Sequence, residues 1–179
     1  VMGLFEHVEF DQHELVVHLT DCASGLQAII AIHSTALGPA AALGNSNATA
    51  VQVDVHGFKA RTGTVRVQIY SANSGYLEKR KWIERVDVPV SRAGTMSVCV
   101  PVKQPGNYVV SVRHDINGNG KSDRSDGAGL SGNPDMKVSD FIFKRKPKLT
   151  TVSFAVGGAT KRVPVVLNYV NGLSFDPVE

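Results

Sequence analysis

Several features that mark common classes of protein are scarce or missing in this sequence. With two cysteines among 179 residues, a cysteine-rich disulfide scaffold is excluded. No stretch approaches the ~20 apolar residues of a membrane-spanning helix, so we expect no membrane span. The Gly-x-Ser-x-Gly turn that carries the nucleophile of many serine hydrolases is missing as well. These absences argue against a helical membrane protein and against the commonest hydrolase fold.

Lysine and arginine are missing from the first part of the chain. Residues 1–50 carry five acids and no base, whereas residues 51–179 carry all 19 bases and the other 11 acids. The two parts have formal charges of −5 and +8, which add to the net charge of +3. Such asymmetry can mark an interaction surface. Here we interpret it as a boundary between two parts of the chain.

The two cysteines lie on opposite sides of this boundary. Their spacing suggests neither a metal site nor a redox motif. Cys99 lies in the apolar run Ser97–Pro101 and is predicted to be a small buried hydrophobic residue. Cys22 follows a polar turn, and its position is compatible with either burial or exposure.

Apolar and polar residues alternate repeatedly between residues 51 and 170, which is typical of half-buried β-strands. Segments rich in glycine, proline and asparagine separate these runs and indicate turns. About eight short strands at this spacing predict an all-β fold, a β-sandwich over residues 51–171. The predicted strands are residues 51–55, 65–69, 86–90, 96–102, 108–112, 137–143, 149–156 and 163–169.

The rest of the chain is divided as follows. Residues 1–44 are predicted to form an N-terminal appendage with a short β-hairpin made of residues 14–19 and 26–33, and residues 45–50 a linker. Residues 172–179 are predicted to be a tail. The charged stretch 76–85 is the main candidate for helical or irregular structure, and Trp82 within it is expected to pack in the core or at a sheet edge.

A run of polar residues and glycines after His114 is the most informative motif. Oxygen-bearing side chains stand at positions 1, 3, 5, 9 and 12 of the segment 115–126, and Gly120 stands at position 6. Ca²⁺ prefers about six to eight oxygen ligands, and this spacing lets one tight turn deliver them. The sequence predicts a calcium-binding loop with these ligands: Asp115, Asn117, Asn119, Lys121 (through its main-chain carbonyl), Asp123 and Asp126.

Two features separate this loop from the helix-loop-helix version of the motif. Position 12 is Asp126 rather than a bidentate glutamate, and the flanks 107–114 and 127–132 read as a strand and a loop. The alternative is an Asn-Gly-rich turn that binds no metal. A bound cation would keep the aspartates ionised, which suits a structural role rather than proton transfer. His114 either orients Asp115 through a hydrogen bond or is a plain histidine at the end of a strand.

Two basic runs, Lys79–Lys81 and residues 144–148, are candidates for contact with nucleic acid, anionic glycans or lipid headgroups. Neither run is interleaved with the aromatic side chains that stack on bases, so no nucleic-acid partner is expected. The simpler interpretation is a solvated face, or charges that protect a sheet edge from aggregation.

Residues 51–176 resemble a family of exported bacterial proteins, domain-of-unknown-function family 2141. The resemblance rests on the strand segments 51–58, 63–70, 98–101 and 163–169, and above all on Pro105–Asp123, which contains His-Asp-Ile-Asn-Gly-Asn-Gly-Lys-Ser-Asp. It implies an immunoglobulin- or transthyretin-like β-sandwich in a periplasmic or extracellular location, and it implies no particular reaction.

Residues 2–41 resemble the extreme N-terminus of the glutamate/leucine/phenylalanine/valine dehydrogenases, through the run Ala23–Ala40. In those enzymes the catalytic lysines and a dinucleotide-binding domain come later in the chain. Here no lysine precedes Lys59, and no glycine-rich turn stands in a βαβ unit. A fragment of about 40 residues is too short to bury a core alone, so the resemblance implies a fusion and transfers no catalytic residue.

Together these observations predict a non-enzymatic, exported-type module of unknown role, stabilised by one Ca²⁺ in the loop 115–126. An envelope protein or a glycan is the candidate partner. Two alternatives remain open: an oxidoreductase-related protein built on the dehydrogenase fragment, and an adhesion or carbohydrate-binding module. The chain shows no recognisable basic and apolar signal peptide, although Ala48–Ala50 resembles the end of one.

Overall fold

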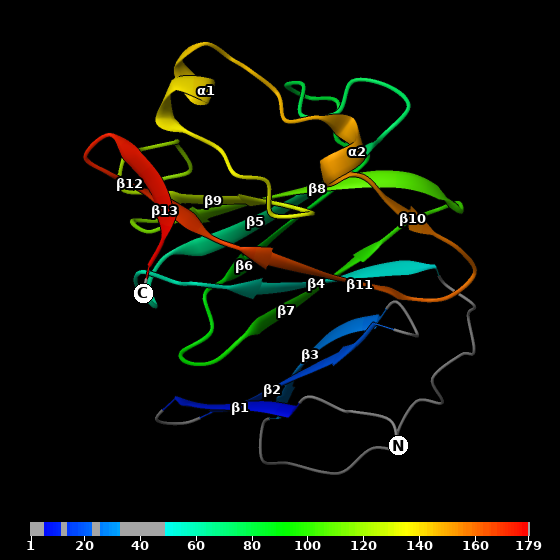
Figure 1. Cartoon of the computed structure of the whole chain (residues 1–179). Helices are drawn as coiled ribbons and strands as arrows, with labels where there is room; N and C mark the ends of the chain where they lie inside the picture. The colour runs from blue at the N-terminus through cyan, green and yellow to red at the C-terminus, as the bar shows by residue number, and fades with distance from the viewer. Residues whose placement is uncertain (1–5, 12–13, 23–25, 33–48, 179) are drawn as a thin grey trace.

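The structure is a computed structural model that describes residues 6–11, 14–22, 26–32 and 49–178. Strands dominate it, with two short helices between the ninth and tenth strands (Figure 1). The elements are β1 (Glu6–Asp11), β2 (Glu14–Asp21), β3 (Leu26–Ile32), β4 (Ala50–His56), β5 (Thr64–Ser71), β6 (Glu84–Pro89), β7 (Met96–Pro101), β8 (Gly106–Asp115), β9 (Gly127–Leu130), α1 (Val138–Ile142), α2 (Leu149–Val152), β10 (Phe154–Val156), β11 (Lys161–Val166), β12 (Asn168–Asn171) and β13 (Ser174–Pro177).

Two sheets form the main body of the protein. The larger has seven strands in the order β13-β12-β9-β8-β5-β6, with β10 paired to β8, and the smaller has three in the order β11-β4-β7. Along the central strands of both sheets, valines stand at alternate positions. Because alternate side chains of a strand point to the same face, these valines meet in one core between the sheets. The predicted all-β sandwich is therefore confirmed. Three central members of this core, Val53, Val67 and Val110, are fully buried.

Most strands pair antiparallel, but β4 and β11 run parallel. Val53 of β4 stands opposite Val163 of β11, and on its other edge β4 pairs antiparallel with β7. The apolar faces of β4 and β11 therefore point into the sandwich together. The long connection from β4 to β11 contains β7 of the smaller sheet and five strands of the larger one, β5, β6, β8, β9 and β10.

The N-terminal strands form a separate three-stranded antiparallel sheet in the order β1-β2-β3. The predicted hairpin is confirmed, since Thr20 of β2 stands opposite Gln27 of β3, and β1 adds a strand to it. Residues 45–48 of the predicted linker lie outside the described residues, and Ala50 already belongs to β4.

A disulfide joins Cys22, just after β2, to Cys99 of β7. The interpretation of Cys99 as a free apolar residue is therefore corrected, although its burial was predicted, since it is 5% exposed. Cysteines 77 positions apart form no short motif, so their spacing did not reveal the pair. The disulfide ties the N-terminal sheet to the edge of the smaller sheet.

Several segments differ from the predictions. The segment 137–143, expected to be a strand, contains α1 (Val138–Ile142), and α2 takes up Leu149–Val152 before the short strand β10. Residues 127–130, expected to be loop, form β9, and the expected tail contains β13. The stretch 76–85 is irregular up to β6, and Trp82 is half-buried against Tyr70, Val109 and their neighbours, as predicted.

The glycines of β9 explain why a strand here looked like a loop. A methyl group on Gly127 would come within 2.5 Å of the Tyr169 ring, and one on Gly129 within 2.5 Å of the Val166 carbonyl oxygen. Glycine in a strand interior often marks such a close approach. No helix in the described part of the chain is long and apolar enough to cross a membrane.

Candidate functional site

The candidate site is the connection between β8 and β9, which carries the segment 115–126. Asp115 is the last residue of β8 and is 1% exposed. Gly63, just before β5, has φ +78°, and a methyl group there would come within 1.9 Å of the Asp115 carbonyl oxygen. Because the chain passes so closely, the start of the loop is fixed by the body of the sandwich.

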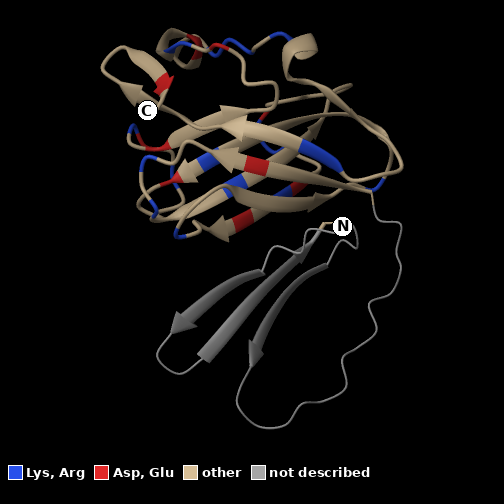
Figure 2. Ribbon diagram, turned by 60° about the horizontal axis from the view of Figure 1, so that its bottom comes forward, with Lys and Arg blue, Asp and Glu red and all other residues tan. Residues whose placement is uncertain are grey.

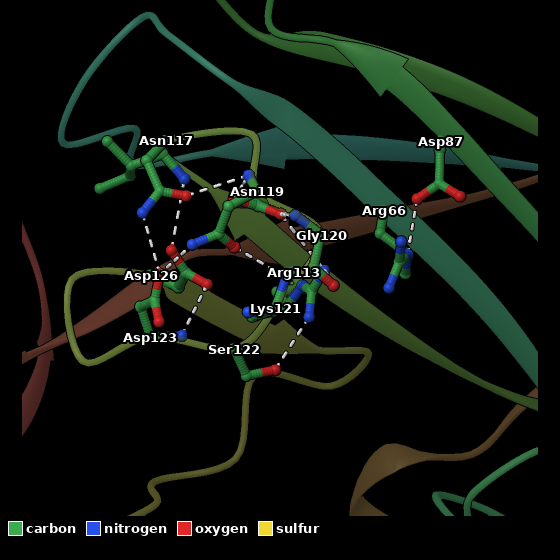
Figure 3. A network of polar contacts seen from close by, with 12 residues as sticks. Arg66, Asp87, Arg113, Asn117, Asn119, Gly120, Lys121, Ser122, Asp123 and Asp126 are labelled. Atoms are coloured by element: carbon green, nitrogen blue, oxygen red, sulfur yellow. Dashed lines mark hydrogen bonds and ion pairs between the residues drawn. The ribbon is translucent and has the colours of Figure 1, made fainter.

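Asp115 organises the first half of the loop through backbone N–H groups. Its Oδ1 accepts a hydrogen bond from the Asn119 N–H (3.2 Å), and its Oδ2 accepts one from the Gly120 N–H (2.8 Å). The Arg113 guanidinium lies 3.4 Å from Oδ2 and balances the buried charge. Arg113 also donates to the Gly120 carbonyl oxygen and to the Ser122 hydroxyl, so that it links β8 to the middle of the loop (Figure 3).

Asn117, Asn119 and Asp123 meet on the outer side of the loop (Figure 3). Asp123 Oδ2 accepts hydrogen bonds from the amide nitrogens of Asn117 (2.9 Å) and Asn119 (2.7 Å). These two bonds hold the pKa of the exposed Asp123 carboxyl below its usual value. The Asn117 Oδ1 accepts the Asn119 N–H, and the Asn119 Oδ1 accepts the Lys121 N–H, which gives two consecutive Asx turns.

Asp126 closes the loop at its other end. It is 8% exposed, and its two oxygens accept the N–H groups of Ile116 (3.3 Å) and Asp123 (3.0 Å). The loop therefore begins and ends on buried carboxylates, with an exposed carboxylate between them. Lys121 is exposed and enters this network through its backbone N–H.

The structure thus brings together Asp115, Asn117, Asn119 and Asp123 in one hydrogen-bonded network, with Asp126 bonded to its margin. The donor set is made of carboxylate, amide and carbonyl oxygens, which are the ligands that Ca²⁺ takes. Among the described residues, no three His, Cys, Asp or Glu side chains are grouped as a metal cluster. A cation here would therefore depend on the asparagine and backbone oxygens as much as on the carboxylates.

His114 lies beside the loop but does not hold it in the way the sequence suggested. It is fully buried, its Nδ1 lies 2.7 Å from the Tyr169 hydroxyl, and its Nε2 lies 2.8 Å from the Thr62 carbonyl oxygen. A carbonyl can only accept, so Nε2 carries the proton and donates, and Nδ1 is left to accept from Tyr169. Both ring nitrogens are engaged away from Asp115, so of the two alternatives for His114 the hydrogen bond to Asp115 is wrong.

Tyr169 and Arg113 are the site residues that the sequence did not reveal. Tyr169 stands 55 positions after His114, accepts the Lys59 N–H and is 2% exposed, and burial raises the pKa of its hydroxyl. For Arg113 the sequence did contain a weak signal, because a basic residue just before a loop rich in aspartate is placed to neutralise the charge of that loop.

Comparison with known proteins gives a family for most of the sandwich. The model of the DUF2141 family, described as an uncharacterized protein conserved in bacteria, matches residues 53–164, which is more than half of the chain. The chain belongs to the DUF2141 family. This confirms the first resemblance stated from the sequence, and the matched residues of this DUF2141 protein include the whole loop 115–126.

Comparison with curated proteins gives a second, shorter match. A valine dehydrogenase from Streptomyces ambofaciens is 62% identical over 40 residues, which are 22% of this chain and 38% of the length of that protein. The chain therefore spans well under half of the curated relative that it matches. No solved structure matches this DUF2141 protein.

Proposed function

We propose that this DUF2141 protein is an exported binding or structural module without catalytic activity, whose loop 115–126 is stabilised by one Ca²⁺. The observation that supports it most is the convergence of polar groups on Asp123, whose Oδ2 receives both asparagine amides. A turn that serves only to reverse the chain needs one or two hydrogen-bonding side chains. This loop has five side chains that present carboxylate or amide oxygens, and each of them is held in place by a hydrogen bond.

Calcium would act on the exposed half of the loop. The Asp123 carboxylate is ionised at neutral pH and is open to solvent, so a cation can reach it without desolvating a buried group. The amides of Asn117 and Asn119 now turn their nitrogens to Asp123. Their Oδ1 atoms each accept one backbone N–H and keep a second lone pair for a cation. Asp115 and Asp126 keep the backbone of the loop in position.

The same proposal includes a location outside the cytoplasm. The Cys22–Cys99 disulfide supports it, because such bonds form and persist in oxidising compartments. Those compartments also hold the free Ca²⁺ that weak extracellular sites require. An exported module of this kind would meet envelope proteins or glycans as partners.

The dehydrogenase-like segment contributes no chemistry to this proposal. Residues 1–50 contain no lysine, and the described strands β1, β2 and β3 form an antiparallel sheet rather than a dinucleotide-binding βαβ unit. We therefore expect no reduction of NAD with valine, leucine or phenylalanine. If the absorbance of reduced cofactor rises when one of these amino acids is added, the result would instead favour the oxidoreductase alternative.

Thermal unfolding with and without Ca²⁺ tests the proposal. A ligand that binds only the folded state raises the free energy of unfolding by RT ln(1 + [L]/Kd), about 2.7 kcal/mol at a hundred times Kd. We expect Ca²⁺ to raise Tm by several degrees, and a chelator to reverse the rise. Mg²⁺ at the same concentration should have a smaller effect, because it requires a stricter octahedral geometry.

Two variants of matched chemistry sharpen this test. Asp123→Asn removes the exposed carboxylate while keeping its size, and it should abolish most of the rise in Tm. Asp135→Asn removes another exposed carboxylate from the segment between β9 and α1 and should leave the rise unchanged. A rise in Tm that is the same in both variants would show that Ca²⁺ acts elsewhere.

A further inference from the structure

Helix α1 presents apolar side chains to solvent. Phe141, Ile142 and Phe143 are 47%, 68% and 65% exposed, and no residue of the helix is buried. Phe141 packs edge-on against Phe175 of β13, with ring centroids 4.7 Å apart. This contact fixes the helix to the β12–β13 hairpin. Three consecutive exposed apolar residues at the end of an anchored helix are unusual on a monomeric surface, and such patches mark interaction sites.

Positive charge follows this patch directly. Lys144, Arg145, Lys146 and Lys148 are all exposed, and the connection from α1 to α2 shows this charge as blue segments in Figure 2. Arg145 lies over the Phe143 ring at 5.1 Å and 3.6 Å from Asp140, and Lys146 lies 3.1 Å from Glu78. Lys144 and Lys148 form no ion pair with any described residue. Their charge is therefore available to a partner.

We propose that α1 and the following basic segment dock this protein on an anionic phospholipid surface. The patch defined by Phe141, Ile142 and Phe143 would enter the boundary between headgroups and acyl chains. The cations of residues 144–148 would lie at the phosphates. Membrane attachment of this reversible kind needs two signals, an apolar insertion and a basic cluster, and this segment supplies both within eight residues, 141–148.

The shape of the patch favours a lipid surface over a folded partner. The exposed apolar residues lie at the end of α1, a short helix at the edge of the molecule (Figure 1). Apolar side chains that project, with cations beside them, match a fluid apolar layer covered by negative charge. The cations also argue against a second copy of this surface as the partner, because two such basic segments would repel each other.

Co-sedimentation with vesicles tests this inference. The intact protein should bind vesicles of phosphatidylcholine mixed with phosphatidylglycerol and should bind phosphatidylcholine alone much more weakly, with the binding falling as salt is added. Lys144→Gln should weaken binding about fivefold. Ile142→Ser should weaken it roughly tenfold by removing apolar insertion. Both residues are exposed, so unchanged thermal unfolding should show that the variants still fold.

A double variant on another surface serves as the control. Ile83 and Lys103 are an exposed apolar and basic pair that line a hollow beside the start of β8. Ile83→Ser combined with Lys103→Gln should leave vesicle binding unchanged, whereas Ile142→Ser combined with Lys144→Gln should nearly abolish it. Equal losses in the two double variants would overturn the inference. Equal binding to neutral vesicles, or self-association that Ile142→Ser removes, would also overturn it.

Discussion

At the scale of single residues, the loop depends on charges that are balanced across neighbouring strands. Arg66 of β5 stands directly opposite Arg113 of β8, a pairing that would be unfavourable alone. Arg66 is neutralised by Asp87 at 2.6 Å, and Arg113 turns to Asp115 and the loop (Figure 3). The two like charges are thus drawn apart, and one of them becomes part of the candidate site.

Gly63 is the residue where the body of the sandwich fixes the loop, and it provides the first prediction. The φ of Gly63 is +78°, which residues with a side chain rarely adopt, and Gly63→Ala adds a methyl group there. This methyl group would lie against the carbonyl oxygens of Asp115 and Ile116. The left-handed backbone costs about 1–2 kcal/mol, and overpacking adds about 1–3 kcal/mol. We expect unfolding in urea to show a loss of about 2–5 kcal/mol.

The control is a glycine with the same conformation in open space. Gly94 has φ +72°, and a methyl group on it would meet no atom within 4 Å. Gly94→Ala should therefore cost only the backbone term of about 1–2 kcal/mol. If the two substitutions cost the same, the close approach between Gly63 and the loop does not contribute to stability.

At the scale of elements, the sequence predicted best the strands whose alternate residues face the core. Val51, Val53 and Val55 alternate with polar residues, and the structure buries all three. The error at α1 arises because the segment 137–143, which ends in Phe141, Ile142 and Phe143, was read as an alternating strand. Only half of a capping box is present, since the Asp140 carboxylate accepts the Lys137 N–H but the lysine side chain has no acceptor to return the bond, so little in the sequence indicated a helix start.

The candidate site was predictable only where its residues are local. The positions from Asp115 to Asp126 lie in one short segment, so their spacing alone indicated that they meet. The partners of His114 and the Cys22–Cys99 pair depend on residues brought together from distant strands. A single sequence carries no local signal for such pairs, because the sheet order that unites them is set by the whole fold.

The disulfide gives a prediction for the elements that it connects. Reduction, or the double substitution of Cys22 and Cys99 by serine, should lower the stability of the sandwich by about 2–4 kcal/mol, because the bond closes a long loop in the unfolded chain. Thermal unfolding with and without reductant measures this. Reductant should have no effect on the double serine variant, and two titratable thiols in the untreated protein would show that the bond does not form.

At the scale of the whole molecule, carboxylates shared between strands link stability to pH. Asp54 of β4 accepts hydrogen bonds from Ser97 of β7 (2.6 Å) and Gln52 (2.9 Å), and lies 3.3 Å from Arg162 of β11. Burial raises the pKa of Asp54, but these three partners outweigh it and hold the pKa below the ordinary 3.8. One carboxylate thus connects all three strands of the smaller sheet.

Acid should therefore weaken the fold in a defined range. A carboxyl whose pKa is lowered by folding stabilises the protein fully above its unfolded pKa, and this contribution is lost as pH falls through the folded pKa. The urea midpoint should be steady near neutral pH and fall as pH drops below 3.8. Asp54→Asn should flatten this fall, whereas Asp135→Asn should not. An equally steep fall in Asp54→Asn would contradict the assignment.

The proposed function depends on the binding of one Ca²⁺ in the loop 115–126 of the β-sandwich. Calorimetric titration of Ca²⁺ into the chelator-treated, disulfide-bonded protein is the most direct test of this binding. The predicted result is saturable heat with a stoichiometry of about one, present in Asp135→Asn and lost in Asp123→Asn. The absence of any heat of binding, or the same isotherm in Asp123→Asn, would contradict it.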